Sequence, residues 1–432
     1  MTTTRTLRFR KLLLAVLLLS ALPLCAEPVE FRQAIELALK HSGAITAASA
    51  DRARAAERYH AERYAYIPTV VFGSGLGYSV GQPVAVAGQA PSIYSLTHNQ
   101  TLFNFAARES VKAAHSDSIA ANMDYADRTE KVILDTALLY IELDNAVQRL
   151  ALARQQKQAV EHAFYIARQR QQEGVGSALD SKRTELDSAR VDLRIAELET
   201  TVDVLRERLG RSIGLSPETL ATVSGSIPAA PPLRAEEDLA SVALSNSASV
   251  RIADEHVRAA RDRARAEHKM NYPSIDFAGQ YAEFAKFNNY TEYFRAFQRN
   301  NGEIGVSVSV PLFANAQDEA QAAQAAVDSQ RIRTELQRLR GRVETETRQA
   351  WEEIREAGTA NEVARMDLDL VREQVSLLLA QMEEGKATLQ EVEEARYAEH
   401  ERWMQLYEAR ASLERAQFQL LRQTRMLVAA LR

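Results

Sequence analysis

The sequence is poor in the residues that build disulfide-bonded or metal-binding folds. Its 432 residues contain a single Cys, which excludes a disulfide framework and any cysteine-based metal cluster. Gly and Pro are also scarce, at 17 and 11 residues, whereas charged residues make up 26% of the chain. A composition dominated by Ala, Glu, Arg, Leu and Gln is typical of long helices.

The short motifs of common enzyme classes are missing as well. The chain has no Gly-rich Lys-Ser/Thr phosphate loop, no His-Glu-x-x-His and no Gly-x-Ser-x-Gly. Gly73, Gly75 and Gly77 alternate along one predicted strand face, which is not the spacing of a nucleotide loop. We therefore expect no enzymatic activity, no cofactor and no metal site. The His residues near a Glu are scattered over separate helical stretches: His60, His162, His256, His268 and His400.

Residues 1–26 are typical of a secretory signal peptide. Basic residues precede an apolar core from Leu12 to Leu22, and Leu24-Cys25-Ala26 provides a cleavage site before Glu27. The apolar run is too short to span a bilayer comfortably. Removing it takes the formal net charge from -5 to about -9. An exported acidic protein is not a nucleic-acid binder by default.

Cys25 allows a second interpretation of this segment. A lipoprotein signal places a Cys directly after the apolar core, where Cys25 stands. Leu24 and Pro23 precede it, however, at positions where small residues would be expected. We favour removal of Cys25 with the signal peptide over its lipidation.

The sequence indicates a duplication. Two copies of one structural unit explain short pieces that recur in the same order and spacing. The pieces return roughly 205 to 211 residues later: Tyr66-Ile67-Pro68 as Asn271-Tyr272-Pro273, Leu102-Phe103 as Leu312-Phe313, and Glu173-Gly174 as Glu384-Gly385.

Each copy is predicted to contain a helix, a β-hairpin, a long helix and a return helix. The first repeat covers 27–215 with its hairpin at about 68–104, and the second covers 236–432 with its hairpin at about 273–313. Pro-rich residues 216–235 connect them. A long helix of this kind would measure about 100 Å. The predicted helices are 30–66, 106–173 and 177–213 in the first copy, and 236–271, 318–384 and 388–431 in the second.

The predicted strands are amphipathic. In the second copy Ile304, Val306 and Val308 alternate with Ser307 and Ser309, a period of two. The first copy shows the same alternation from Val70 through Phe72, Leu76, Tyr78 and Val80. The loop 287–301 carries aromatic residues, which suit either a membrane interface or loop packing: Tyr290, Tyr293, Phe294 and Phe297.

Four such strands cannot sit alone in lipid, because their open edges would leave backbone groups unpaired. Three chains would supply twelve strands, enough for a closed barrel. A small soluble sandwich between the helices is the alternative.

These features together resemble the TolC family of outer-membrane efflux proteins. The likeness rests on the duplicated architecture, on Ala34-Ile35-Glu36-Leu37-Ala38-Leu39, on the prolines Pro68, Pro273 and Pro311 at the strand ends, and on the turn sequences after Gly174 and Gly385. It implies a mainly α protein with a membrane β-barrel part: a trimeric 12-stranded barrel continuous with an α-helical periplasmic tunnel. It also implies a homotrimer in the outer membrane, a passive exit duct in contact with lipid. Its partners would be a periplasmic adaptor protein and an inner-membrane transporter, in efflux or type I secretion.

The resemblance places the helical turns at Gly174 and Gly385 at the periplasmic tip. The acidic residues that the family often carries there correspond to Glu391 and Glu394, with Asp180 as the first-copy counterpart. In a trimer they would ring a periplasmic aperture and favour cations. The alternative is a solvated acidic helix face. Family members that lock the closed tip use Tyr and Arg near this turn, whereas this chain has Met382 and Ala387.

Two other functions stay open. A periplasmic adaptor also has long helical hairpins, but it would show one hairpin inserted into a β-domain rather than two complete copies. An exported coiled-coil scaffold would leave the alternation at 303–312 unexplained.

Overall fold

The computed structural model describes residues 27–75, 92–174, 177–231, 236–284, 300–311 and 316–431. The predicted signal peptide with Cys25, the strand residues Leu76, Tyr78 and Val80, and the aromatic loop residues 290–297 lie outside these ranges. The chain forms two compact units. Unit 1 comprises Met1–Thr46, Arg128–Ser247 and Val343–Arg432, and unit 2 comprises Ala47–Asp127 and Ala248–Arg342. Each unit takes segments from both predicted repeats.

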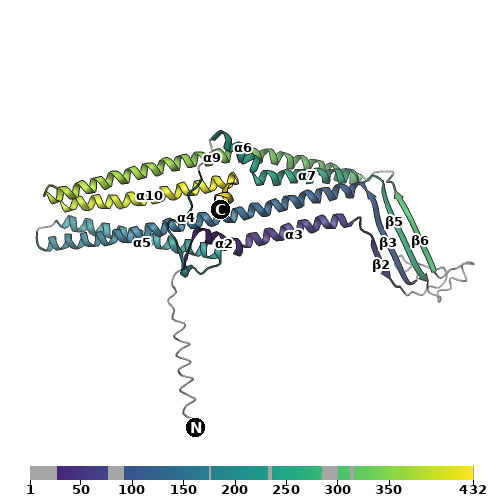
Figure 1. The fold of residues 1–432 in the computed structure, drawn as a ribbon, viewed down its shortest axis with the longest axis horizontal. Helices are drawn as coiled ribbons and strands as arrows, with labels where there is room; N and C mark the ends of the chain where they lie inside the picture. Colours follow the sequence, from purple (N-terminus) through teal and green to yellow (C-terminus); the bar gives the residue numbers. More distant parts are fainter. Residues whose placement is uncertain are drawn as a thin grey trace, which may run out of the picture. The chain divides into compact units, whose positions relative to one another are not determined.

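Unit 2 contains a four-stranded antiparallel sheet. Its strands are β2 (Thr69–Gly73), β3 (Ser92–Asn104), β5 (Ser274–Phe284) and β6 (Asn300–Ser309), and they lie side by side in the order β2-β3-β5-β6 (Figure 1). The two hairpins thus join through β3 and β5, which pair from Ser92 to Asn104. β6 begins at Asn300, so the predicted loop ends earlier than residue 301.

The helices of unit 2 flank this sheet in sequence. They are α3 (Gly43–Tyr64), the first part of α4 (Phe105–Gln172), α7 (Ala248–His268) and the first part of α9 (Ala316–Glu383). Both long helices have 68 residues. Aromatic and charged contacts tie α4 to α3 and α7, and α9 to α7: Tyr59 with His115, Arg52 over Tyr125, Arg263 with Asp117, and Arg340 with Asp254.

Unit 1 has its own hydrophobic core. Phe31 packs edge-on against Tyr140, with ring centroids 5.3 Å apart, and against Phe418 at 5.6 Å. All three rings are almost fully buried. The core draws on the second part of α4 and on further helices: α2 (Phe31–His41), α5 (Ala178–Ile213), α10 (Leu389–Gln423) and α11 (Leu427–Ala430). A smaller cluster joins Leu239 of α6 (Glu236–Asn246) to Ala350 and Leu420.

The Pro-rich connection is part of this core. After the short helix η1 (Pro217–Thr219), strand β4 (Leu220–Thr222) pairs in parallel with β1 (Glu27–Val29). The Tyr140 hydroxyl donates to the Val29 carbonyl oxygen at 2.8 Å and accepts the Val223 N–H at 2.9 Å. One buried phenol therefore ties both strands to α4, an arrangement that Pro content alone did not predict.

Two predicted helices are each broken once. The helix predicted at 30–66 is divided at Ser42, whose backbone is extended with ψ 114°. The helix predicted at 236–271 is divided at Ser247, between α6 and α7. A serine favours such breaks because its hydroxyl competes for backbone hydrogen bonds. Here the Ser42 hydroxyl accepts the Ile45 N–H at 3.4 Å.

No helix within the described ranges is long and apolar enough to cross a membrane.

Candidate functional site

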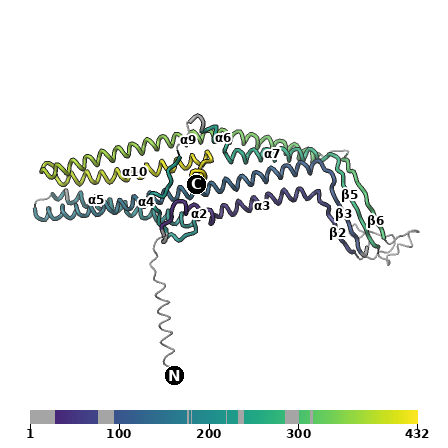
Figure 2. Tube along the Cα trace, viewed as in Figure 1, coloured from purple at the N-terminus to yellow at the C-terminus, as the bar shows by residue number. Residues whose placement is uncertain are grey.

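Two helical hairpins in unit 1 end in glycine turns. The second part of α4 returns as α5, and the second part of α9 returns as α10 (Figure 2). Gly174 and Gly385 lie in these turns with φ 76° and 72°. Glycine adopts this left-handed backbone without the strain that a Cβ would add.

The start of α10 is fixed by a capping box. The Thr388 N–H and hydroxyl both donate to the Glu391 carboxylate, at 2.7 and 2.9 Å, and the Thr388 hydroxyl accepts the Glu391 N–H at 3.3 Å. These bonds from Thr388 hold the pKa of Glu391 below its usual range. Glu391 thus has a structural role that sequence reasoning missed, although Thr388-x-x-Glu391 is the pattern of this motif.

Glu394 and Asp180 are the other two residues predicted to line the aperture. Glu394 is exposed, and it accepts a hydrogen bond from the Gln390 side chain at 3.0 Å. Asp180 lies in the first turn of α5, and its side chain is outside the described set. Both Glu391 and Asp180 stand near helix N-termini, where the helix dipole favours negative charge.

A cavity of about 640 Å³ lies between α4, α5 and α10 close to these turns. Its wall is apolar along α4 except for Arg170, and it carries charged residues on α5 and α10. The lining includes Val160, Ile166, Arg170, Arg183, Leu389 and Tyr397. The described part of the chain holds no cluster of three or more His, Cys, Asp or Glu side chains that could bind a metal ion.

Ion pairs hold the hairpins together. Lys157 of α4 pairs with Asp192 of α5 at 2.6 Å, and Arg372 of α9 pairs with Glu399 of α10 at 3.6 Å. An Arg194–Glu401 ion pair links α5 of one hairpin to α10 of the other. The sequence carried no signal for this link, because its partners stand far apart on separate helices. Met382 and Ala387, which stand on either side of the Gly385 turn, are partly buried.

The sheet of unit 2 has one apolar and one polar face. The strand register places Ile275, Phe277 and Tyr281 opposite Val308, Val306 and Gly302, on the side that also carries Phe72 and Leu96. Many side chains of this face are exposed in the chain, among them Ile304 by 77%, Phe72 by 71% and Val306 by 60%. Ile275 and Phe277 are half-buried. The polar exceptions on this side include His98, Gln100, Glu283 and Asn300. The opposite face is mostly Ser, Thr, Gly, Gln and Asp, with Val71 and two Ala as exceptions.

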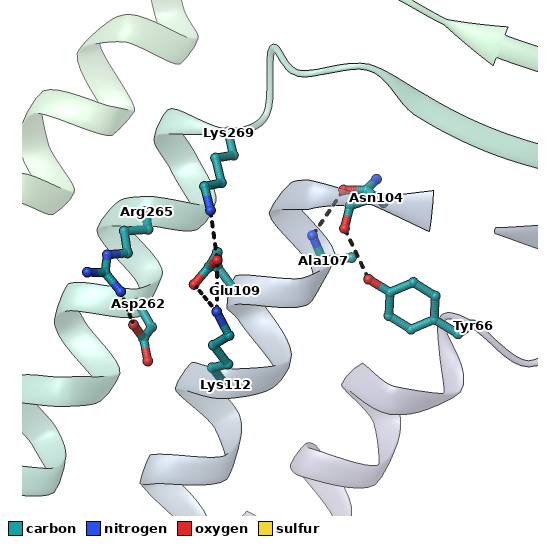
Figure 3. A network of polar contacts seen from close by, with 8 residues as sticks. All are labelled: Tyr66, Asn104, Ala107, Glu109, Lys112, Asp262, Arg265 and Lys269. Carbon is teal, nitrogen blue, oxygen red and sulfur yellow. Dashed lines mark hydrogen bonds and ion pairs between the residues drawn. The ribbon is translucent and has the colours of Figure 1, made fainter. Parts of the chain in front are cut away.

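The predicted prolines lie where strands begin and end. Pro68 and Pro273 directly precede β2 and β5, and Pro311 follows β6. Where β3 ends, the Tyr66 hydroxyl donates to the Asn104 carbonyl oxygen at 3.1 Å, as Figure 3 shows. Asn104 in turn caps α4 by accepting the Ala107 N–H at 3.0 Å.

A buried carboxylate joins α4 to α7 at the same level. Glu109 accepts hydrogen bonds from Lys112 at 3.0 Å and from Lys269 at 2.7 Å (Figure 3). Burial of Glu109 raises its pKa, but the bonds from the two lysines outweigh burial and leave the pKa below its ordinary value.

Comparisons with known proteins agree with this arrangement. Residues 34–215 match the family model of the Outer membrane efflux protein. Residues 34–215 therefore carry a domain of this family. Along 362 residues it is 23% identical to the Proteases secretion protein PrtF of Dickeya chrysanthemi, with 80% of this chain and 76% of PrtF covered.

The chain also matches solved channel structures in fold. The outer membrane protein VceC from Vibrio cholerae superposes with a TM-score of 0.74 at 17% identity, covering 93% of this chain and 95% of VceC. The CmeC outer membrane channel of Campylobacter jejuni gives 0.75 at 13% identity, covering 92% and 86%. The predictions of an outer-membrane efflux protein and of a location in the outer membrane, with the helical part in the periplasm, are confirmed. The family is one of transport proteins rather than of enzymes.

Proposed function

We propose that this outer membrane efflux protein is a passive exit duct built from three copies of the chain. The observation that carries the proposal is the four-stranded sheet with one exposed apolar face and one polar face. β2 and β6 are the outer strands of that sheet. Unpaired strand edges are not tolerated in lipid. Pairing β2 of one chain with β6 of the next, three times over, would close a twelve-stranded barrel with the apolar face outward.

The duct would be served by a periplasmic adaptor and an inner-membrane transporter that provides the energy. Support comes from the match to a protein named for protease secretion, which extends over most of both chains. Protein export by type I secretion is therefore the cargo class we favour, and efflux of small molecules is the alternative. The chain has two hairpin-bearing halves joined in one sheet, which favours a duct over a periplasmic adaptor or a coiled-coil scaffold.

Cysteine cross-linking tests the trimer. The only Cys stands in the predicted signal peptide, so introduced cysteines would react alone. Thr69→Cys on β2 and Ser307→Cys on β6 lie on the polar face of the two edge strands. With both changes in one chain, a flexible bismaleimide should give a ladder that stops at three chains. Each single variant is the control and should give no ladder. A ladder beyond three chains, or a monodisperse monomer that needs no detergent, would refute the closed trimer.

We further propose that Glu394 and Glu391 line the periplasmic aperture. Glu394→Gln is the cleaner variant. Within the described residues Glu394 bonds to the Gln390 side chain alone, whereas Glu391 caps α10. Cation preference, read from reversal potentials in a salt gradient, should fall in Glu394→Gln. The loss should be smaller in 1 M than in 0.1 M salt, where the screening lengths are about 3 and 10 Å. Glu346→Gln, an exposed residue in the middle of α9, is the control. An equal change of selectivity in the control would refute the assignment.

A further inference from the structure

Unit 2 contains a cavity at the junction of helices and strands. Its volume is about 510 Å³, and it is lined by Arg63, Tyr66, Phe103, Arg108, Val111 and Lys112 together with Asn104. Arg63 is the next-to-last residue of α3, and Arg108, Val111 and Lys112 lie in the first two turns of α4. The bond between the Tyr66 hydroxyl and the Asn104 carbonyl fixes one wall (Figure 3). Burial raises the pKa of Tyr66, and the nearby Arg108 charge acts against that rise.

The strand register shows which side of the sheet the cavity adjoins. Phe103 pairs with Ile275 across β3 and β5, and Ile275 in turn pairs with Val308. Cross-strand partners point to the same face, so Phe103 belongs to the apolar face. Phe103 also packs edge-on against Phe105, with centroids 4.5 Å apart. The cavity therefore begins where the apolar face of the sheet ends.

The cations around the cavity are available to a ligand. Arg63 and Arg108 are exposed, and neither forms an ion pair with an acidic residue in the ranges that the structure describes. Arg63 instead lies over the Tyr59 ring, 5.6 Å from its centroid. Lys112 is shared with Glu109. Two arginines beside an aromatic and aliphatic wall match an anion that carries an apolar tail.

We propose that this cavity binds the phosphate headgroup of an anionic phospholipid. The inference rests on the proposed function, which places the apolar face of the sheet in the hydrocarbon layer and the helices in the periplasm. The cavity then lies at the level of the headgroups of the periplasmic leaflet. Arg63 and Arg108 bind the phosphoryl oxygens, and the acyl chains continue along Phe103 and the apolar face. The site anchors the depth at which the protein sits in the membrane.

Lipid binding to the purified, detergent-extracted full chain tests the proposal. The probe is dioleoyl phosphatidylglycerol added to delipidated protein at low salt, with bound lipid counted by native mass spectrometry. A surface arginine contributes about a fivefold change in affinity for anionic lipid, so the double variant Arg63→Gln/Arg108→Gln should bind about thirtyfold more weakly. The matched control is Arg54→Gln/Arg58→Gln, two exposed arginines of the same helix, which should bind as the parent chain does.

Three results would overturn the site. Equal lipid binding by Arg63→Gln/Arg108→Gln and the parent would show that the arginines do not hold the headgroup. Equal binding of phosphatidylcholine would show that anionic charge is not recognised. Inorganic phosphate that displaces the lipid at millimolar concentration would assign the cavity to a soluble phosphate. Channel conductance, measured on the same double variant, separates the two proposals: a conducting trimer without lipid selectivity refutes the site alone, and a chain that forms no channel refutes the duct.

Discussion

Val306→Arg tests the membrane orientation of the sheet most sharply. Val306 is 60% exposed on the apolar face and lies opposite Phe277. It stands five residues before Pro311, which is about 16 Å along a strand at roughly 3.3 Å per residue. With a strand tilt of about 40° this is about 13 Å in height, near the middle of an apolar band about 25 Å tall.

The expected cost follows from this depth. An arginine on the lipid face costs about 2–4 kcal/mol at the midplane and about 0–1 kcal/mol near the interface. Val306→Arg should therefore lower the free energy of unfolding by about 2–4 kcal/mol per chain. Val308→Arg, about 8 Å above Pro311 by the same arithmetic, should cost less. Ser307→Arg points to the polar face, opposite Asp276, and should change stability little.

Urea titration of the protein in phospholipid vesicles measures these differences, with the folded fraction read from its unheated mobility on detergent gels. The predicted order of destabilisation is Val306→Arg, then Val308→Arg, then Ser307→Arg. Equal midpoints for the variants at 306 and 307 would refute the assignment of the two faces. A larger cost at 307 than at 306 would reverse it.

Three further changes test the packing of the units. Glu109→Gln should reduce the free energy of unfolding by about 1–2 kcal/mol at pH 7. Because folding lowers the pKa of Glu109, this contribution is present above the ordinary Glu pKa and is lost as the pH falls through the lowered value. If the urea midpoints of parent and variant differed equally at pH 7 and pH 3, this prediction would be contradicted. Gly214→Ala should lower the melting temperature more than Gly174→Ala. Both glycines have φ 76°, but at Gly214 the new Cβ would lie 2.8 Å from the His41 ring. Equal shifts would show that the His41 side chain moves away without a cost in stability. Tyr140→Phe should cost about 1–3 kcal/mol by leaving buried backbone groups unpaired, and an unchanged melting temperature would mean that water replaces the hydroxyl.

Local signals in the sequence located most of the secondary structure. The alternation of Ile304, Val306 and Val308 corresponds to strand β6, and a stretch without Gly or Pro corresponds to α4 at Phe105–Gln172. Prolines and period-two patterns act through neighbouring residues, so they can be recognised without knowing the rest of the fold.

Other features depend on residues that are distant in the sequence. The Pro-rich connection looks like a linker by composition, yet Leu220 is buried and Val223 bonds to Tyr140. The Arg194–Glu401 pair could not be found either, since many Arg and Glu residues occupy similar helix positions. Ser42 breaks its helix although helical periodicity continues past it. In the candidate site, the glycine turns could be recognised from the sequence. The acidic side chain of Glu391 suggested an aperture residue, and its role in the capping box of α10 was not predicted.

Conductance of a planar lipid bilayer tests the central claim most directly. Purified full-length protein, extracted in detergent and added to one side of the bilayer, should produce discrete current steps without any nucleotide or transporter. Current should appear only from the trimer fraction of a size-exclusion column. A protein that stays in buffer without detergent and leaves the bilayer non-conducting at every concentration would contradict the account.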